Sequence, residues 1–238
     1  MGLKELGTGF TGGPTNGPEK QGQLFEVTRF PEEEPYRIVS LRELKVDSEQ
    51  DLEDYYRLLA HPANREHFSN PPTDPNNLKE KLTRDNTHAY LAEDTLGKVV
   101  GAGGINDAQP GEHDHWLVKA AVDPELQGKG LGKQLLVRLI EEAFTTKTSY
   151  DTDRAKLVAS IIRNVKGWER MPGLLEQLGF RPLHIMLNEV DVYVQEEKKT
   201  VKKPTERWEL SKDDWMRIRR RKEISQMLKP PNSHIDAA

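Results

Sequence analysis

The chain has 238 residues, of which 35% are hydrophobic and 31% are charged, a lean composition that favours one domain with polar extensions. Its formal net charge of -4 weighs against a general nucleic-acid binder, and the lack of cysteine excludes a thiol nucleophile, a disulfide framework and a cysteine-bearing zinc site. No stretch has the length of a membrane span and the N-terminus lacks the apolar core of a signal peptide, so we expect a cytoplasmic protein without membrane association.

The first part of the chain changes from a glycine-rich and proline-rich segment to regular structure. Residues 1–34 are poor in branched apolar residues, which predicts a disordered extension. Alternating residues at 36–44 predict a first strand. Ser48 then opens a capping-box pattern and predicts a helix that ends near His61, and a second helix is predicted at 76–85.

The middle of the chain predicts a hairpin followed by alternating strands and helices. Strands at 88–93 and 98–105 are joined by the turn residues 94–97. The remaining predicted elements are a strand at 116–122, a helix at 131–144, a strand at 155–162, a helix that stops at Gly179, and one or two strands within 183–194. The predicted order over residues 35–195 is therefore β-α-α-β-β-β-α-β-α-β.

The last part of the chain is strongly charged. We expect residues 196–238 to form a charged tail in which a helix at 211–228 begins at the capping residue Ser211. The basic cluster at 217–222 has two interpretations. It is either a signal for nuclear targeting or RNA contact, or the solvated face of a helix.

A glycine-rich run at 127–133 joins a predicted strand to a predicted helix. Its glycines let a phosphate approach the backbone, and the first amides of the helix are unsatisfied donors at the positive end of a dipole. The Walker loop is excluded, because Gln134 follows Lys133 where a hydroxyl is required. The dinucleotide fingerprint is excluded as well, because its third glycine position is Lys133.

The pattern that remains is Gln127-x-x-Gly130-x-Gly132, preceded by Val122-Asp123-Pro124-Glu125. This run resembles the acetyl-coenzyme A loop of the GCN5-related N-acetyltransferases (GNAT), and Leu178-Gly179-Phe180 is a second, weaker family trait. The alternative is a loop whose glycines serve turn geometry alone. The resemblance covers residues 35–195 and implies an α/β GNAT fold: a mixed, mostly antiparallel sheet of six to seven strands, flanking helices, and fourth and fifth strands that splay apart.

The resemblance further implies acetyl-CoA as the co-substrate and no metal. The pantetheine arm is expected to pair with the fourth strand, and the pyrophosphate to accept hydrogen bonds from the loop amides. Asn164 matches a family asparagine beside that arm, with a helix N-cap as the alternative, and plain solvent exposure is the alternative role of the loop lysines. The expected cofactor-binding residues are Ala120, Ala121, Val122, Gln127, Gly128, Lys129, Gly130, Leu131, Gly132, Lys133 and Asn164.

The implied reaction is acyl transfer, in which an amine attacks the thioester and the thiolate leaves. A backbone N–H in the fourth strand is expected to stabilise the oxyanion. An alkyl amine has a pKa of about 10.4 and arrives protonated, so a group must accept its proton. The candidates are His115, Asp114 and Glu93, with a structural role as the alternative for His115. The run 113–115 also resembles half of a metal site, but no further ligand is near in sequence.

One position departs from the family pattern. Leu175 stands where many members place a tyrosine that protonates the leaving thiolate. Either Tyr193 or Tyr90 protonates the thiolate in place of that tyrosine, or the thiolate leaves without a proton donor. The segment 163–174 is longer than usual and contains Trp168, which either lines an acceptor wall or belongs to the core.

The sequence therefore indicates an acetyl-CoA-dependent N-acetyltransferase that acts on a small-molecule or protein amine. A coenzyme A-binding regulatory module with weak catalysis is the alternative, motivated by Leu175. A third hypothesis is a docking subunit that binds RNA or protein through its C-terminal tail. No motif identifies the acceptor or the oligomeric state.

Overall fold

The computed structural model describes residues 36–69, 71–84, 86–108, 114–148, 150, 152–165, 167–183, 189–194, 199–221, 224 and 227. The chain divides into two compact units, Met1–Glu34 and Pro35–Ala238, and all described residues belong to the second. The disorder predicted for residues 1–34 therefore lies outside the described residues. Among the helices of the described part, none is long and apolar enough to cross a membrane.

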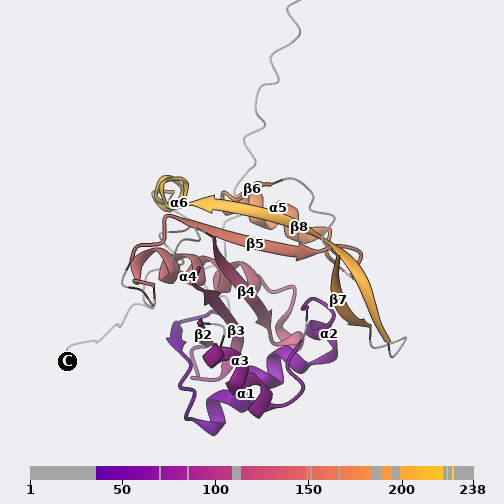
Figure 1. The fold of residues 1–238 in the computed structure, drawn as a ribbon. Helices are drawn as coiled ribbons and strands as arrows, with labels where there is room; N and C mark the ends of the chain where they lie inside the picture. The colour runs from indigo at the N-terminus through magenta and orange to yellow at the C-terminus, as the bar shows by residue number, and fades with distance from the viewer. Residues whose placement is uncertain are drawn as a thin grey trace, which may run out of the picture. The chain divides into compact units, whose positions relative to one another are not determined.

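An eight-stranded sheet forms the centre of the second unit (Figure 1). Its order is β1-β2-β3-β4-β5-β8-β6, and β7 pairs with β8 beside this path. The pairing of β4 with β5 is parallel, whereas the other described pairings are antiparallel. The strands are β1 Ser40–Glu43, β2 Thr87–Glu93, β3 Val99–Asn106, β4 His115–Val122, β5 Lys156–Ile162, β6 Arg181–Pro182, β7 Glu189–Val194 and β8 Lys199–Ser211.

The helices begin where local sequence signals place them. Ser48 accepts a hydrogen bond from the Asp51 N–H at 3.3 Å, so the predicted capping residue is confirmed. The short helix α2 lies between the two predicted helices, where no element was predicted, and has Pro62 in its first turn. The described helices are α1 Glu49–Ala60, α2 Pro62–Arg65, α3 Pro75–Arg84, the 3-10 helix η1 Pro124–Leu126, α4 Leu131–Thr145, α5 Arg170–Gln177 and α6 Lys212–Arg219.

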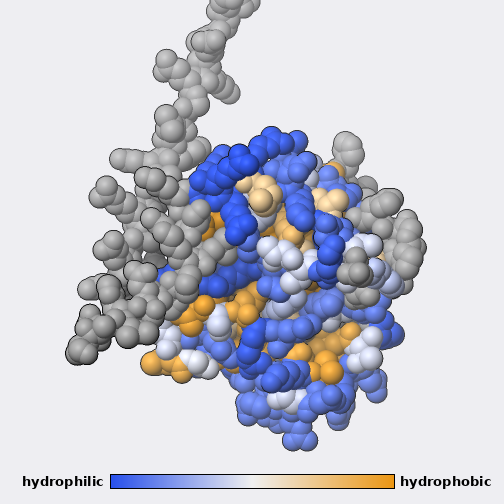
Figure 2. Space-filling view, turned by 90° about the vertical axis from the view of Figure 1, so that its left-hand side faces the viewer, coloured by the Kyte–Doolittle hydropathy of each residue, from blue (hydrophilic) through white to orange (hydrophobic). Residues whose placement is uncertain are grey.

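Hydrophobic clusters lie on both faces of the sheet, because successive residues of a strand point to opposite sides. Leu91 of β2 packs in the cluster that includes side chains of α1 and α3. Its neighbours Tyr90 and Ala92 pack in the cluster that includes α4, α5 and Trp215 of α6. The face of the molecule shown in Figure 2 is mostly hydrophilic with scattered apolar patches, as expected when most apolar side chains pack inward.

The C-terminal segment differs from the charged tail predicted after residue 195. Residues 199–211 form β8, which pairs along β5 and adds a strand beyond the six to seven expected. The helix predicted at 211–228 is observed at 212–219. Charged residues concealed this strand, since Glu206, Arg207 and Glu209 surround its buried core residues Trp208 and Leu210. The sheet and its core therefore continue well past residue 195.

Trp208→Ala tests this placement of β8. The side chain is 2% exposed, so its removal is expected to lower the free energy of unfolding by about 3–5 kcal/mol. The control Met216→Ala, at a side chain that is 41% exposed, should change it by less than about 0.5 kcal/mol. Urea unfolding of both variants measures the difference, and equal small effects would contradict the burial of β8.

Candidate functional site

The glycine-rich loop follows β4 and leads directly into α4. Gly128 and Gly130 have φ of +80° and +79°, the left-handed region in which glycine avoids a Cβ clash. A Cβ at Gly128, Gly130 or Gly132 would meet no atom within 4 Å, so the loop faces open space. Gly130 caps α4 without a side-chain hydrogen bond, and the Lys133 N–H donates to its carbonyl at 3.1 Å. The donors that this helix start offers are therefore the amides before Lys133. The loop therefore presents backbone donors to a ligand from outside.

Asn64 of α2 holds this loop from the side, a role that no sequence pattern indicated. Its Nδ2 donates to the Leu58 carbonyl at 2.8 Å and to the Val122 carbonyl at 3.0 Å. Its Oδ1 accepts a hydrogen bond from Gln127 Nε2 at 2.8 Å. The Asn64 side chain, 4% exposed, thus joins α1, the end of β4 and the start of the loop.

β4 carries a β-bulge before it reaches the loop. The ladder with β3 runs through Gly104↔Val118 and resumes at Ala102↔Ala121, so β4 contains an extra residue between these pairs. Lys119, within the bulge, has φ of +53°, which is strained for a side chain of this size. A bulge leaves a backbone group without a ladder partner and bends its strand.

β4 and β5 separate at the same level of the sheet. Their parallel ladder begins at His115↔Leu157 and its last pair is Leu117↔Ala159, although both strands continue. The predicted splay of the fourth and fifth strands is therefore confirmed. Backbone groups of β4 beyond Leu117 face a gap in place of a neighbouring strand, which lets an extended ligand pair with them.

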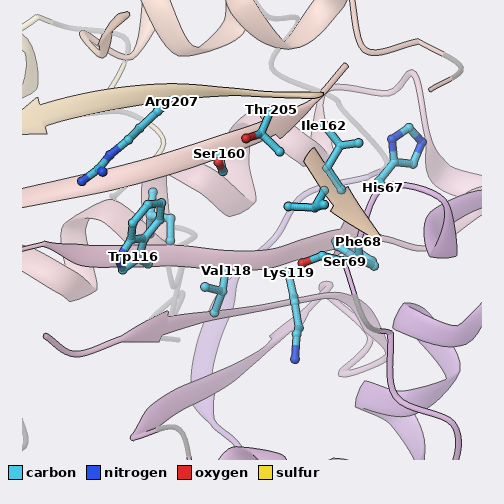
Figure 3. Close-up of a pocket in the computed structure, with 12 residues that line it drawn as sticks. His67, Phe68, Ser69, Trp116, Val118, Lys119, Ser160, Ile162, Thr205 and Arg207 are labelled. Carbon is cyan, nitrogen blue, oxygen red and sulfur yellow. The ribbon is translucent and has the colours of Figure 1, made fainter. Parts of the chain in front are cut away.

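A cavity of about 370 Å³ lies at this separation (Figure 3). Arg207 of β8 extends toward Trp116 of β4, and Ser160 projects from β5 into the gap (Figure 3). The guanidinium of Arg207 lies 4.7 Å from the centroid of the Trp116 ring. The lining residues are His67, Phe68, Ser69, Trp116, Leu117, Val118, Lys119, Ser160, Ile162, Val190, Thr205 and Arg207.

His67, which sequence reasoning missed, is the cavity residue whose charge changes nearest to neutral pH. Its side chain follows α2 at the cavity edge and is exposed on one side. Desolvation by the neighbouring structure lowers the pKa of His67 below its usual value, against the opposing charge of Glu66. The imidazole is therefore neutral and able to accept a proton at pH 7.

The predicted base His115 lies instead in a buried polar cluster. Arg154 Nε donates to Asp107 Oδ1 at 2.7 Å, and both side chains are fully buried. His115 Nδ1 lies 3.3 Å from the same oxygen and 3.2 Å from the Ala108 N–H. Desolvation lowers the pKa of His115 despite the Asp107 charge. His88 lies 3.1 Å from the other oxygen of Asp107, and this hydrogen bond raises the pKa of His88.

Asp114 and Glu93, the other predicted catalytic residues, are held in ion pairs. Although desolvation opposes the shift, hydrogen bonds from Lys156 and Arg207 lower the pKa of Asp114. Glu93 Oε1 accepts a hydrogen bond from Arg42 Nε at 2.6 Å. The cavity lining includes neither of these carboxylates and does not include His115.

Lys129 and Asn164, two of the expected cofactor-binding residues, each contact another part of the chain. Lys129 Nζ lies 3.7 Å from the centroid of the Tyr36 ring, an arrangement that favours a cation. Asn164 is exposed just past β5 with φ of +59°, and its carbonyl accepts a hydrogen bond from Lys203 at 2.9 Å. Asn164 therefore ends β5 in a turn, outside the cavity lining.

The position of the missing family tyrosine is apolar core. Leu175 is 2% exposed and packs in the cluster around α4, and Trp168 packs partly buried against the same cluster. Of the two predicted substitutes, Tyr90 is 5% exposed, and Tyr193 lies beneath the guanidinium of Arg65 at 4.6 Å. Among the described residues, no group of histidine, aspartate or glutamate side chains is arranged to hold a metal ion.

Comparisons with known proteins agree with this geometry. Residues 49–154 match the model of the acetyltransferase (GNAT) family. No curated protein sequence matches the chain significantly. A spermidine N-acetyltransferase from Vibrio cholerae, solved with CoA and spermine, superposes with a TM-score of 0.59 at 16% identity, covering 74% of this chain and 97% of that one. A mutant form of the spermidine/spermine N-acetyltransferase from Vibrio cholerae superposes with a TM-score of 0.58 at 17% identity, covering 75% and 96%. At these identities the likeness establishes the fold.

Asn64→Asp tests whether the side chain holds the loop. The carboxylate cannot donate to the carbonyls of Leu58 and Val122 and places an unpaired charge in a buried position. The free energy of unfolding should fall by about 3–5 kcal/mol. The matched control Asn76→Asp, at an exposed position of α3, should change it by less than about 0.5 kcal/mol. Similar values in the two variants would show that Asn64 is not a structural link.

Proposed function

We propose that this chain, whose residues 49–154 match the acetyltransferase (GNAT) family, transfers the acetyl group of acetyl-CoA to a primary amine. The observation that carries this proposal is the separation of β4 from β5 immediately before an open, glycine-rich helix start. One ligand can then pair with β4 through an extended arm and place a diphosphate on the loop. The lack of cysteine supports the cytoplasmic location that we propose for the reaction.

The loop residues fit the diphosphate part of acetyl-CoA. Backbone N–H groups from Gly128 to Gly132 would donate to the phosphate oxygens, each charge-assisted bond contributing roughly 1.5–3 kcal/mol. The Lys133 N–H, expected among these donors, instead donates to the Gly130 carbonyl at 3.1 Å. Lys129 adds positive charge from its place beside Tyr36. Gln127 contributes by holding the loop to Asn64, since its Nε2 donates to that side chain. The backbone of Ala120–Val122 would pair with the pantetheine arm.

The bulge of β4 supports a role in stabilising the tetrahedral oxyanion. The bulge places the backbone of Ala120 next to the gap between β4 and β5. An N–H held rigidly by the surrounding ladder would stabilise negative charge as the amine attacks the thioester carbon. The carbon–nitrogen bond then forms and the carbon–sulfur bond breaks.

We propose that His67 accepts the proton of the attacking amine. The side chain lines the cavity and its lowered pKa keeps it neutral at pH 7. The three bases expected from the sequence serve the fold in our proposal, because each is held by a cation or a buried cluster outside the cavity lining. With Leu175 in the core, the coenzyme A thiolate leaves without a tyrosine at that position.

The alternative is a module that binds coenzyme A with weak catalysis, and Leu175 is the observation that favours it. Release of free thiol from acetyl-CoA in the presence of amines separates the two functions. Thiol release that depends on an amine supports the enzyme. Binding without such release supports the module.

Gly132→Glu tests the loop as the diphosphate site. Acetyl-CoA at about one hundred times its dissociation constant should stabilise the wild-type chain by about 2.7 kcal/mol. The variant should lose this shift, because a carboxylate would lie against the diphosphate. Gly132 suits the test better than Gly130, where positive φ would add backbone strain.

The control is Gly173→Glu, because a Cβ at this glycine in α5 also meets open space. It should retain the full shift in thermal unfolding with acetyl-CoA. A full shift in Gly132→Glu as well would contradict the loop assignment.

His67→Gln tests the proton acceptor. Loss of a general base should lower kcat/KM by roughly 10²-fold or more, with little change in the acetyl-CoA thermal shift. In the wild type, kcat/KM should rise with pH through a pKa below about 6.5, because His67 must be neutral. That limb should be absent from the variant, and added imidazole should restore part of the rate.

The matched control is His61→Gln, at an exposed histidine outside the cavity lining that caps α2 through its Nδ1. Its pH profile should keep the limb assigned to His67. An unchanged profile in His67→Gln, or a lost rate that imidazole fails to restore, would rule out this role.

A further inference from the structure

We propose that the acceptor is an amine with one positive charge on an apolar body, and that the cavity selects against polyamines. This inference rests on the proposed acetyltransferase function and specifies the substrate class of the same site. The solved Vibrio cholerae protein contains spermine, but at 16% identity its likeness establishes the fold alone. The acceptor class must therefore be derived from the cavity of this chain.

The cavity walls are largely apolar. Trp116, Leu117 and Val118 come from β4, and Phe68 follows α2. Val190 of β7 also lines the cavity. Apolar walls with a small number of polar groups are the usual construction of a site that binds an uncharged organic body.

Hydroxyl groups supply the polar part of the same lining. The cavity lining includes three hydroxyl side chains. Ser69 lies in the loop after α2, Ser160 in β5 and Thr205 in β8. Ser160 is the first residue of β5 after the ladder with β4 ends at Ala159. These hydroxyls can orient one amine by hydrogen bonds without providing a countercharge.

Apart from His67, the ionisable side chains of the described lining are the basic residues Arg207 and Lys119. Arg207 is fixed by a hydrogen bond to Asp114 and by its position over Trp116. Asp114 also pairs with Lys156 at 3.0 Å and is not part of the lining. The guanidinium is therefore the charged part of this cluster that faces the cavity.

Mono- and diamines behave differently in such surroundings. The reacting amine becomes neutral when it loses its proton, so its charge need not remain in the cavity. A second ammonium group keeps its charge, must give up water beside apolar walls, and is repelled by Arg207. A polyamine thus encounters a cost that a monoamine of equal length avoids.

The experiment compares hexylamine with 1,6-diaminohexane, which differ by one terminal ammonium group. For the wild-type chain with saturating acetyl-CoA, we expect kcat/KM to be at least about tenfold higher for hexylamine. Spermidine should be a poorer acceptor than hexylamine. A higher kcat/KM for 1,6-diaminohexane or spermidine would overturn the inference.

Ser69→Asp adds a carboxylate to the exposed edge of the cavity, and Ser69→Asn is its isosteric, uncharged control. Ser69→Asp should lower the preference for hexylamine by about tenfold, because the second ammonium then gains a partner. Ser69→Asn should keep the wild-type preference within about threefold. Equal preferences in the two variants would show that charge in this cavity does not select the acceptor.

Failure of this inference is distinguishable from failure of the proposed function. Preferred acetylation of the diamine overturns the acceptor class and leaves the acetyltransferase in place. Absence of amine-dependent thiol release with every amine overturns both.

Discussion

The separation of β4 from β5 is the constraint on which the rest of the site depends. Parallel strands that pair along their whole length leave no room for a ligand, whereas here the ladder ends at Leu117 and Ala159. The bulge at Lys119 bends β4 at that level, since an extra residue raises the local twist. The cavity therefore lies beside this part of β4, and the glycine-rich loop follows the same strand.

The bent shape of β4 costs free energy. Lys119 adopts a left-handed backbone conformation, which is unfavourable by about 1–3 kcal/mol for a residue with a side chain. The two ends of the strand are fixed by separate polar anchors. At its start, the buried pair of Asp107 and Arg154 holds His115. At its end, the Asn64 amide binds the Val122 carbonyl. We interpret these anchors as the reason why the bulge persists between them, since strain survives only where surrounding structure over-determines it.

Features set by neighbouring residues could be predicted from the sequence. The cap at Ser48, the hairpin around residues 94–97 and the start of α4 are each decided within a few positions. The strand at 199–211 could not be predicted, because its buried residues Trp208 and Leu210 stand among charged residues in the sequence. The expected role of His115 as a base illustrates the same limit. The Arg154 and Asp107 side chains that hold it are distant in sequence, so no local pattern indicated its buried cluster.

The sequence by itself determined the strand-loop-helix unit and the resemblance to the GNAT family, because glycine spacing and helix starts are local properties of the chain. Only the tertiary structure decided which side chains meet at the cavity. His67, Ser160 and Arg207 come from three separate parts of the chain, and the sheet order places β8 beside β5 and β5 beside β4. The physical reason is that an acceptor is recognised by walls from several elements, whose mutual distances are set by packing and strand register and not by any local pattern.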